Sequence, residues 1–181
     1  MAVLPPRPAE RLLKKAYASY KRFKDGGCTN FRLLQEAIDL YADARRLSKA
    51  LLIKDNVMII RAEIGLTECH RELSHVHRYG AKKKLSHVDE AKGFIEHALM
   101  LAKQIGNADL TWRAELESAV IRARRAMLVA KTAGPGDLEV QKAVEQARAD
   151  LESLKDTPEV EQYTGFVEWA ELWLSKLPQA I

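Results

Sequence analysis

The sequence contains an internal repeat, which constrains the fold more than any other feature: a pattern of small and apolar residues recurs 54 positions further along the chain. Its first part occurs at Leu34, Ala37, Tyr41, Ala44 and Leu51, and again at Val88, Ala91, Ile95, Ala98 and Ile105. Its second part occurs at Met58, Ala62, Gly65, Leu66, Cys69, Leu73 and Val76, and again at Trp112, Leu116, Ala119, Val120, Ala123, Met127 and Ala130. Apolar residues three and four positions apart form one face of an α-helix. Each copy therefore predicts a hairpin of two long helices.

The periodic segments and the turn residues between them predict an all-α protein. We expect seven helices, at about residues 8–24, 31–52, 56–79, 87–105, 108–132, 137–155 and 159–177. Glycine and proline follow most of these segments, as they do at helix ends. The lysine-rich segment 81–85 is expected to be a loop. The arrangement that we predict is a right-handed stack of antiparallel hairpins with an N-terminal capping helix, and a closed helical bundle is the alternative.

Length and composition are those of one folded domain. The chain has 181 residues, of which 47% are hydrophobic and 30% charged. Residues 1–8 are proline-rich and expected to be extended, and residues 9–181 are expected to form a single α-helical repeat domain. No apolar run approaches the roughly 18 residues of a membrane span, so no membrane contact is expected. The two cysteines form no disulfide framework, which indicates the cytoplasm, with the nucleus as an alternative.

Two segments resemble the second helix of the tetratricopeptide (TPR) repeat, which has a small residue, a bulky residue four positions later and an alanine three further on. The matching triplets are Ala37, Tyr41 and Ala44, and Ala91, Ile95 and Ala98. Ile64 and Gly65 resemble the Leu-Gly pair of the first TPR helix, where a small residue allows close helix approach. The period here is 54 residues rather than about 34, and the aromatic residue near the start of the first TPR helix and the closing proline are missing. The resemblance, over about residues 31–133, implies stacked helices that bind an extended peptide.

Arginines at equivalent positions of the two copies suggest where a peptide could bind. Arg71 and Arg125 are separated by the repeat length and lie opposite the apolar stripes of their helices. The same helix faces carry the other candidate peptide-binding residues, Glu68, His75 and Arg122. Arginine binds carboxylates with two parallel hydrogen bonds, so an acidic partner is expected. In the alternative interpretation both arginines pair with neighbouring glutamates, namely Glu68, Glu72 or Glu117. Because position 119 is the alanine equivalent to Gly65, we also expect Gly65 to tolerate alanine.

The C-terminal segment has a wider apolar surface than an end helix needs. On a helical wheel of residues 159–177, apolar residues fill about half of the circumference, whereas a surface helix needs a stripe of about 100°. Phe166, Trp169 and Trp173 lie on one flank. Tryptophan clusters are common in interfaces, so this flank is a candidate contact with a partner or with a second copy of the chain.

The histidines do not show metal-ligand spacing, so neither a metal site nor a cofactor is expected. His70 and His77 are seven residues apart, roughly 10 Å along a helix. His87 and His97 belong to another helix and could complete a site only through packing. Nucleic-acid binding is not expected either, because few aromatic residues accompany the basic ones.

The function that we expect is therefore a non-catalytic scaffold or adaptor that binds a protein or peptide segment. The alternative is an enzyme or a small-ligand-binding bundle, with a site between the helices of residues 31–132. An enclosed polar cavity would favour this alternative, and an open surface would favour the scaffold.

Overall fold

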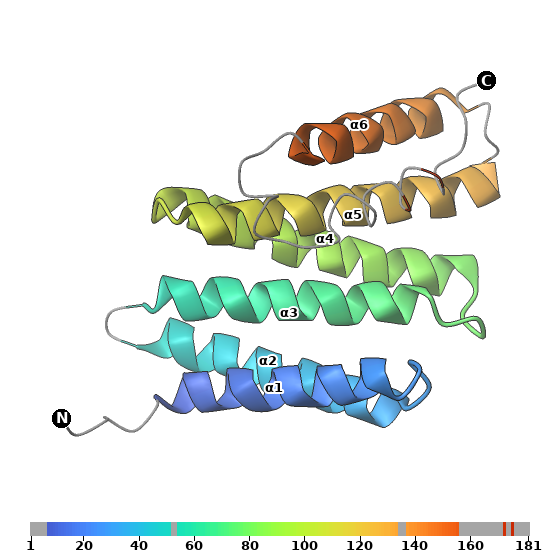
Figure 1. The fold of residues 1–181 in the computed structure, drawn as a ribbon. Helices are drawn as coiled ribbons and strands as arrows, with labels where there is room; N and C mark the ends of the chain where they lie inside the picture. The colour runs from blue at the N-terminus through green and yellow to red at the C-terminus, as the bar shows by residue number, and fades with distance from the viewer. Residues whose placement is uncertain (1–6, 52–53, 134–136, 156–171, 173–174, 176–181) are drawn as a thin grey trace.

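The computed structural model describes residues 7–51, 54–133 and 137–155, together with Leu172 and Ser175. These residues form an all-helical structure (Figure 1). Its helices are α1 (Pro8–Asp25), α2 (Phe31–Ala50), α3 (Asn56–Ser74), α4 (Ala81–Gln104), α5 (Ala108–Ala133) and α6 (Leu138–Lys155). The described part of the chain thus contains six of the seven helices that the sequence predicts. The seventh, at 159–177, lies almost entirely outside it.

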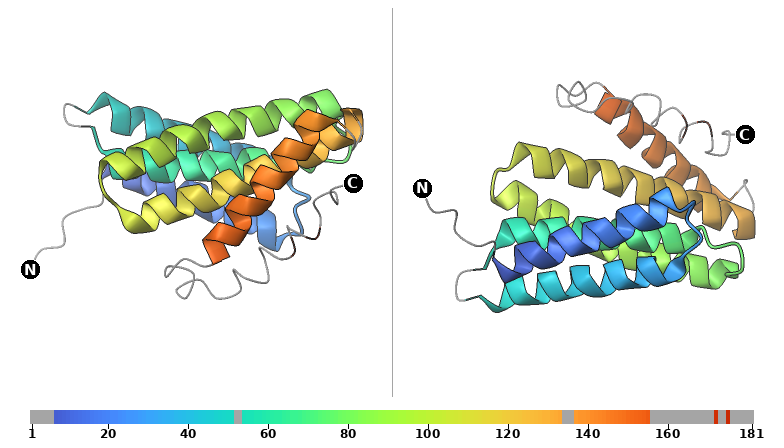
Figure 2. Two further views of the ribbon diagram at one scale, coloured as in Figure 1. Left: turned by 90° about the horizontal axis from the view of Figure 1, so that it is seen from above. Right: turned by 60° about the horizontal axis from the view of Figure 1, so that its bottom comes forward.

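Each helix packs against the next one along the chain, so that the molecule is a layered stack running from α1 and α2 to α6 (Figure 1). Successive helices run in opposite directions, and α6 crosses α5 obliquely (Figure 2). In addition, α3 contacts both α1 and α5. The three odd-numbered helices therefore lie next to one another, and we call the side of the stack that they share the odd-helix face.

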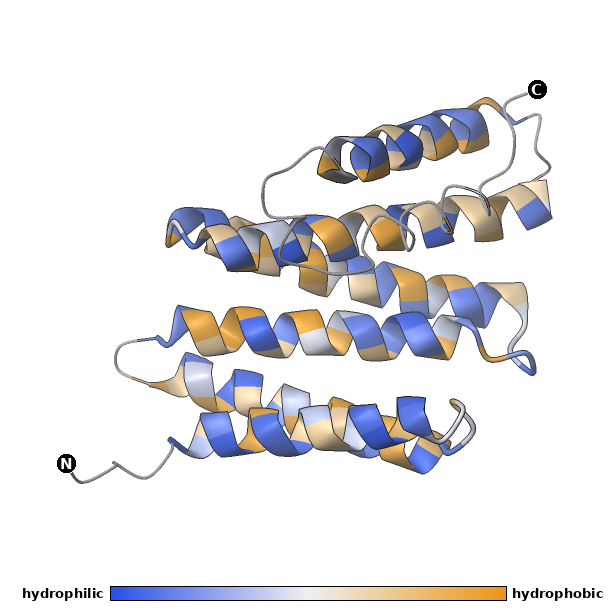
Figure 3. Ribbon diagram, viewed as in Figure 1, coloured by the Kyte–Doolittle hydropathy of each residue, from blue (hydrophilic) through white to orange (hydrophobic). Residues whose placement is uncertain are grey.

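The repeated apolar stripes form the core. Ala37, Tyr41 and Ala44 of the first copy are buried, as are Ala91, Ile95 and Ala98 of the second. The first three pack with side chains of α1 and α3, and Ile95 and Ala98 pack with side chains of α3 and α5. Along every described helix, apolar residues recur between polar ones, as is typical of amphipathic helices (Figure 3). The prediction of buried stripes is confirmed at these six positions, whereas Leu51, the last position of the first stripe, is exposed.

The start of α4 differs from the prediction. The lysine-rich segment 81–85, expected as a loop, forms the first turn of α4. Gly80 is the N-cap, and its carbonyl accepts a hydrogen bond from the Lys84 amide at 3.1 Å. Lysine is a good helix former, so nothing local prevents the helix from starting early. The helix expected at 56–79 also ends earlier, at Ser74, so the connection between α3 and α4 runs from His75 to Gly80.

Gly65 has less room than the repeat suggests. A Cβ atom built on Gly65 would lie 2.4 Å from two ring atoms of Tyr41, and 2.7 Å from a third. Tyr41 is itself buried, so its ring has no open space to enter. This geometry argues against the expectation that Gly65 tolerates alanine, because Tyr41 of α2 packs directly on the α3 backbone at this position.

Candidate functional site

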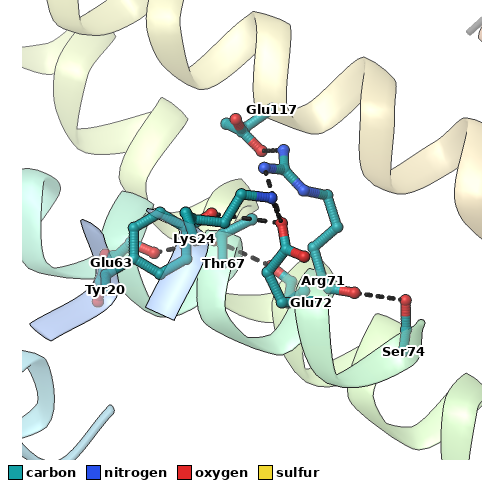
Figure 4. Close-up of polar contacts among 9 residues, drawn as sticks. Tyr20, Lys24, Glu63, Thr67, Arg71, Glu72, Ser74 and Glu117 are labelled. Carbon is teal, nitrogen blue, oxygen red and sulfur yellow. Dashed lines mark hydrogen bonds and ion pairs between the residues drawn. The ribbon is translucent and has the colours of Figure 1, made fainter. Parts of the chain in front are cut away.

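A chain of charged side chains crosses the odd-helix face and joins α1, α3 and α5 (Figure 4). Lys24 of α1 pairs with Glu72 of α3 at 2.9 Å, and the Tyr20 hydroxyl donates to the same carboxylate at 3.4 Å. Arg71 of α3 approaches Glu72 to 3.8 Å and pairs with Glu117 of α5. Three helices are thereby linked by alternating charges.

Arg71 and Glu117 form the most buried pair of this network. Their side chains are 13% and 11% exposed. Burial opposes the positive charge of Arg71, but Glu117 and the other acidic side chains more than offset it and raise the pKa of the guanidinium. Arg71 therefore stays charged and holds α3 against α5.

A pocket of about 300 Å³ opens beside this pair, between α3 and α5. Apolar side chains form part of its wall, and acidic side chains outnumber basic ones on the rest. It is lined by Ile64, Glu68, Asp109, Trp112, Arg113, Leu116 and Glu117.

Glu68 is the unusual residue of this pocket. Its side chain lies among the odd-numbered helices, and burial, followed by repulsion from Glu117, raises its pKa to about 7, although Arg71 and Arg113 act in the opposite direction. Within the described ranges, no hydrogen bond or ion pair of 4 Å or less reaches its carboxylate. Glu68 therefore keeps its proton to a higher pH than an ordinary carboxyl group does. A carboxyl group in this state can accept a cation or exchange a proton.

The structure places the predicted binding residues in different surroundings. Glu68 and Arg71 lie together at the pocket, whereas His75 is exposed at the C-cap of α3. Arg122 pairs with Asp150 of α6 at 2.7 Å, and Arg125 pairs with Asp89 of α4 at 3.2 Å. Arg71 pairs with neighbouring glutamates, as the alternative interpretation predicted. A shared binding surface for all five residues stays a prediction.

The sequence reasoning missed Arg113, Trp112 and Glu117 as members of one site. Arg113 and Glu117 are four residues apart, a spacing that places both on one side of a helix. This spacing could have indicated a polar patch on α5. Whether this patch lies near Glu68 depends on how α5 packs against α3, and the spacing of residues within one helix does not reveal that packing.

A second buried acid, Glu63, joins α2, α3 and α4. Its fully buried carboxylate accepts from Arg45 Nε at 2.6 Å, and His97 Nδ1 lies at 2.6 Å. Lys49 approaches it to 3.6 Å. Because two basic side chains of α2 and a histidine of α4 surround the carboxylate, Glu63 is a packing element of the core and not a candidate binding group.

The predicted interface residues Phe166, Trp169 and Trp173 lie outside the described residues. A scan against protein-family models finds no match, and searches of curated proteins and of solved structures find no similar chain. In the described part of the chain, no helix combines the length and the apolar character needed to cross a membrane.

Proposed function

We propose that this protein is a non-catalytic helical-repeat scaffold that binds a polypeptide segment on the odd-helix face, with a lysine or arginine side chain of that segment in the Glu68 pocket. The observation that carries the proposal is Glu68, a carboxyl group with a pKa of about 7 in an open pocket, without a cation in direct contact among the described residues. A bound cation would stabilise its carboxylate form.

The charges around the pocket favour a basic rather than an acidic ligand group. Among the lining residues, Glu117 already pairs with Arg71, whereas the Glu68 carboxylate has no cation in direct contact among the described residues, so Glu68 is the acid that a ligand cation would meet. Arg71, which the sequence suggested for binding a carboxylate, is engaged by Glu117 and Glu72. The acidic partner expected from the sequence is therefore replaced in this proposal by a basic one.

The shape and chemistry of the pocket suit a long basic side chain. Lysine and arginine have an apolar stem and a charged end, and they bury the stem while the end meets polar groups. Ile64, Trp112 and Leu116 offer apolar surface for the stem, and Glu68 offers the acceptor for the charged end.

Two features support a polypeptide segment as the ligand. Charged groups continue from the pocket across α3 to Glu72, Lys24 and Tyr20, so a chain anchored in the pocket would meet further polar partners. The resemblance of the sequence to TPR repeats implies a right-handed stack of antiparallel hairpins that binds extended peptides. We expect the segment to lie across the odd-numbered helices.

The test uses three fluorescent seven-residue peptide libraries that are randomised except at the centre, which holds lysine, norleucine or glutamate. Norleucine has the four-carbon stem of lysine without its ammonium group. The wild type should bind the lysine library at least about tenfold more tightly than the norleucine library, a difference of about 1.4 kcal/mol. Glu68→Gln should lose this preference, and Glu96→Gln, which changes an exposed acid on α4, should keep it. Equal binding of the three libraries by the wild type would contradict the proposal.

The second candidate function is a small-ligand site or an enzyme at the same pocket. Its support is the same pKa of about 7, because a carboxyl group that titrates near neutral pH is suited to acid–base chemistry. Butylamine distinguishes the two candidates, because it carries only the stem and the charged end. Butylamine binding as tight as that of the lysine library would favour the small-ligand site, and binding at least about tenfold weaker would favour the scaffold.

A further inference from the structure

Two histidines that are distant in the sequence meet at the interface of α3 and α4. His70 Nδ1 of α3 lies 3.4 Å from His87 Nδ1 of α4. His70 Nδ1 also lies 3.4 Å from a carboxylate oxygen of Glu90, which is one helical turn after His87. One ligand atom from each of these three residues lies within 4.8 Å of the other two. Two nitrogens and one oxygen thus surround a single point.

These separations match a metal site better than a hydrogen bond. A nitrogen or oxygen ligand lies about 2.0–2.1 Å from zinc, and two ligands of a tetrahedral ion are then about 3.4 Å apart. The usual donor–acceptor distance of a hydrogen bond from nitrogen is shorter, about 2.9–3.0 Å. The spacing of His70 to both His87 and Glu90 is therefore that of an edge of the zinc coordination tetrahedron.

The surroundings hold the two rings in place. His87 is stacked on Tyr79, with ring centres 5.7 Å apart, and His70 lies 5.7 Å from the ring of Phe94. Burial lowers the pKa of both histidines, which favours the neutral form of each ring. Neutral imidazole is the form that binds a metal ion.

We infer that His70, His87 and Glu90 form a binding site for a divalent transition-metal ion, for which zinc is the best fit. Two imidazoles and a carboxylate suit zinc better than magnesium or calcium, which prefer oxygen ligands. Three protein ligands leave a fourth coordination position for a water molecule or an external ligand, and Glu90 is exposed. The bound ion would tie α3 to α4. This site is separate from the Glu68 pocket and does not depend on the proposed function.

The sequence did not predict this site, because the spacing of His70 and His87 follows no metal-ligand pattern. Their separation of 17 residues becomes a contact only because α4 folds back along α3. The exposed His75 and His77 are the obvious competitors, since surface histidines also bind zinc weakly. They provide the matched control.

The experiment is calorimetric titration of the metal-free full-length protein with zinc chloride, together with the visible spectrum of the cobalt(II) form. The wild type should bind one zinc ion per chain, and cobalt should give the intense visible bands of a tetrahedral site. His87→Gln and Glu90→Gln should each weaken zinc binding at least about tenfold. The double variant His75→Gln with His77→Gln should bind like the wild type. Circular dichroism checks that every variant remains folded.

Three results would overturn the inference. The first is a wild type that binds no zinc at micromolar concentration, and the second is a wild-type affinity that persists in folded His87→Gln. The third is loss of binding in the His75 and His77 double variant, which would assign the metal to exposed surface histidines.

Discussion

Replacing Gly65 by alanine tests the packing of α2 on α3 with a single methyl group. The new Cβ would lie 2.4 Å from the ring of Tyr41, whereas carbon atoms in contact are about 3.5–4.0 Å apart. The ring must therefore retreat by more than about 1 Å, and because Tyr41 is buried, α2 must move with it. Overpacking of this kind costs about 1–3 kcal/mol. Alanine also gains about 1 kcal/mol of helix propensity over glycine.

Gly93 is the matched control, since it lies inside α4 with nothing within 4 Å of the position of a Cβ atom. Gly93→Ala should raise the free energy of unfolding by about 0.5–1 kcal/mol through helix propensity alone. Both variants gain the same propensity, so the difference between them isolates the clash at Gly65. We expect Gly65→Ala to be less stable than Gly93→Ala by about 1–3 kcal/mol.

The assay is equilibrium unfolding in urea, followed by the helical circular dichroism signal. Adding Tyr41→Leu should reverse the sign, so that Gly65→Ala stabilises the protein once the ring is absent. The reasoning would be refuted by a Gly65→Ala variant as stable as Gly93→Ala, or by an effect that Tyr41→Leu leaves unchanged.

The remaining predictions concern the charged residues, and the same unfolding assay tests them. Arg71→Ala should lower the free energy of unfolding by about 3–5 kcal/mol, because it leaves Glu117 largely buried without its cation. Arg125→Ala removes an exposed pair and should lower it by about 0–1 kcal/mol. Equal losses of stability in the two variants would contradict this. Arg124→Met should lower the free energy of unfolding by about 1–3 kcal/mol, because the buried guanidinium donates to the hydroxyl and to the backbone carbonyl of Ser74 at the C-terminus of α3. A variant as stable as the wild type would show that these hydrogen bonds do not stabilise the fold. The pKa of Glu68 is about 7 in the folded protein against an ordinary 4.5. The free energy of unfolding of the wild type should therefore fall relative to that of Glu68→Gln as the pH rises from 4.5 to 7, and the difference between the two should stay constant above pH 7. A difference in free energy that does not change with pH would refute the raised pKa.

The buried core could be predicted from the sequence because it depends on periodicity within single helices. Ala91 and Ile95 are buried because their spacing puts them on one face, whatever lies opposite. The room at Gly65 could not be predicted this way, because it depends on a ring of another helix. The repeat pattern aligns Gly65 with position 119, but the two positions face different neighbours.

The polar sites could not be predicted from the sequence, for a related reason. Glu68 meets Arg113, and His70 meets His87, only after two helices are placed side by side at one particular stagger. The sequence is misleading about Arg71 for the same reason. Arg71 has the chemistry of a carboxylate receptor, but a carboxylate of α5 already binds it.

The most direct test of the proposed function is the pKa of the Glu68 carboxyl group, measured by carbon-13 NMR titration with and without the lysine-centred library. Without peptide the pKa should be about 7. With the lysine-centred library it should fall by about one unit or more, because a cation in contact with a carboxylate favours its ionised form. The norleucine-centred library should leave it unchanged. A pKa of Glu68 that the lysine-centred library does not lower, at a concentration where binding is saturated, would contradict the assignment of this pocket to a basic side chain.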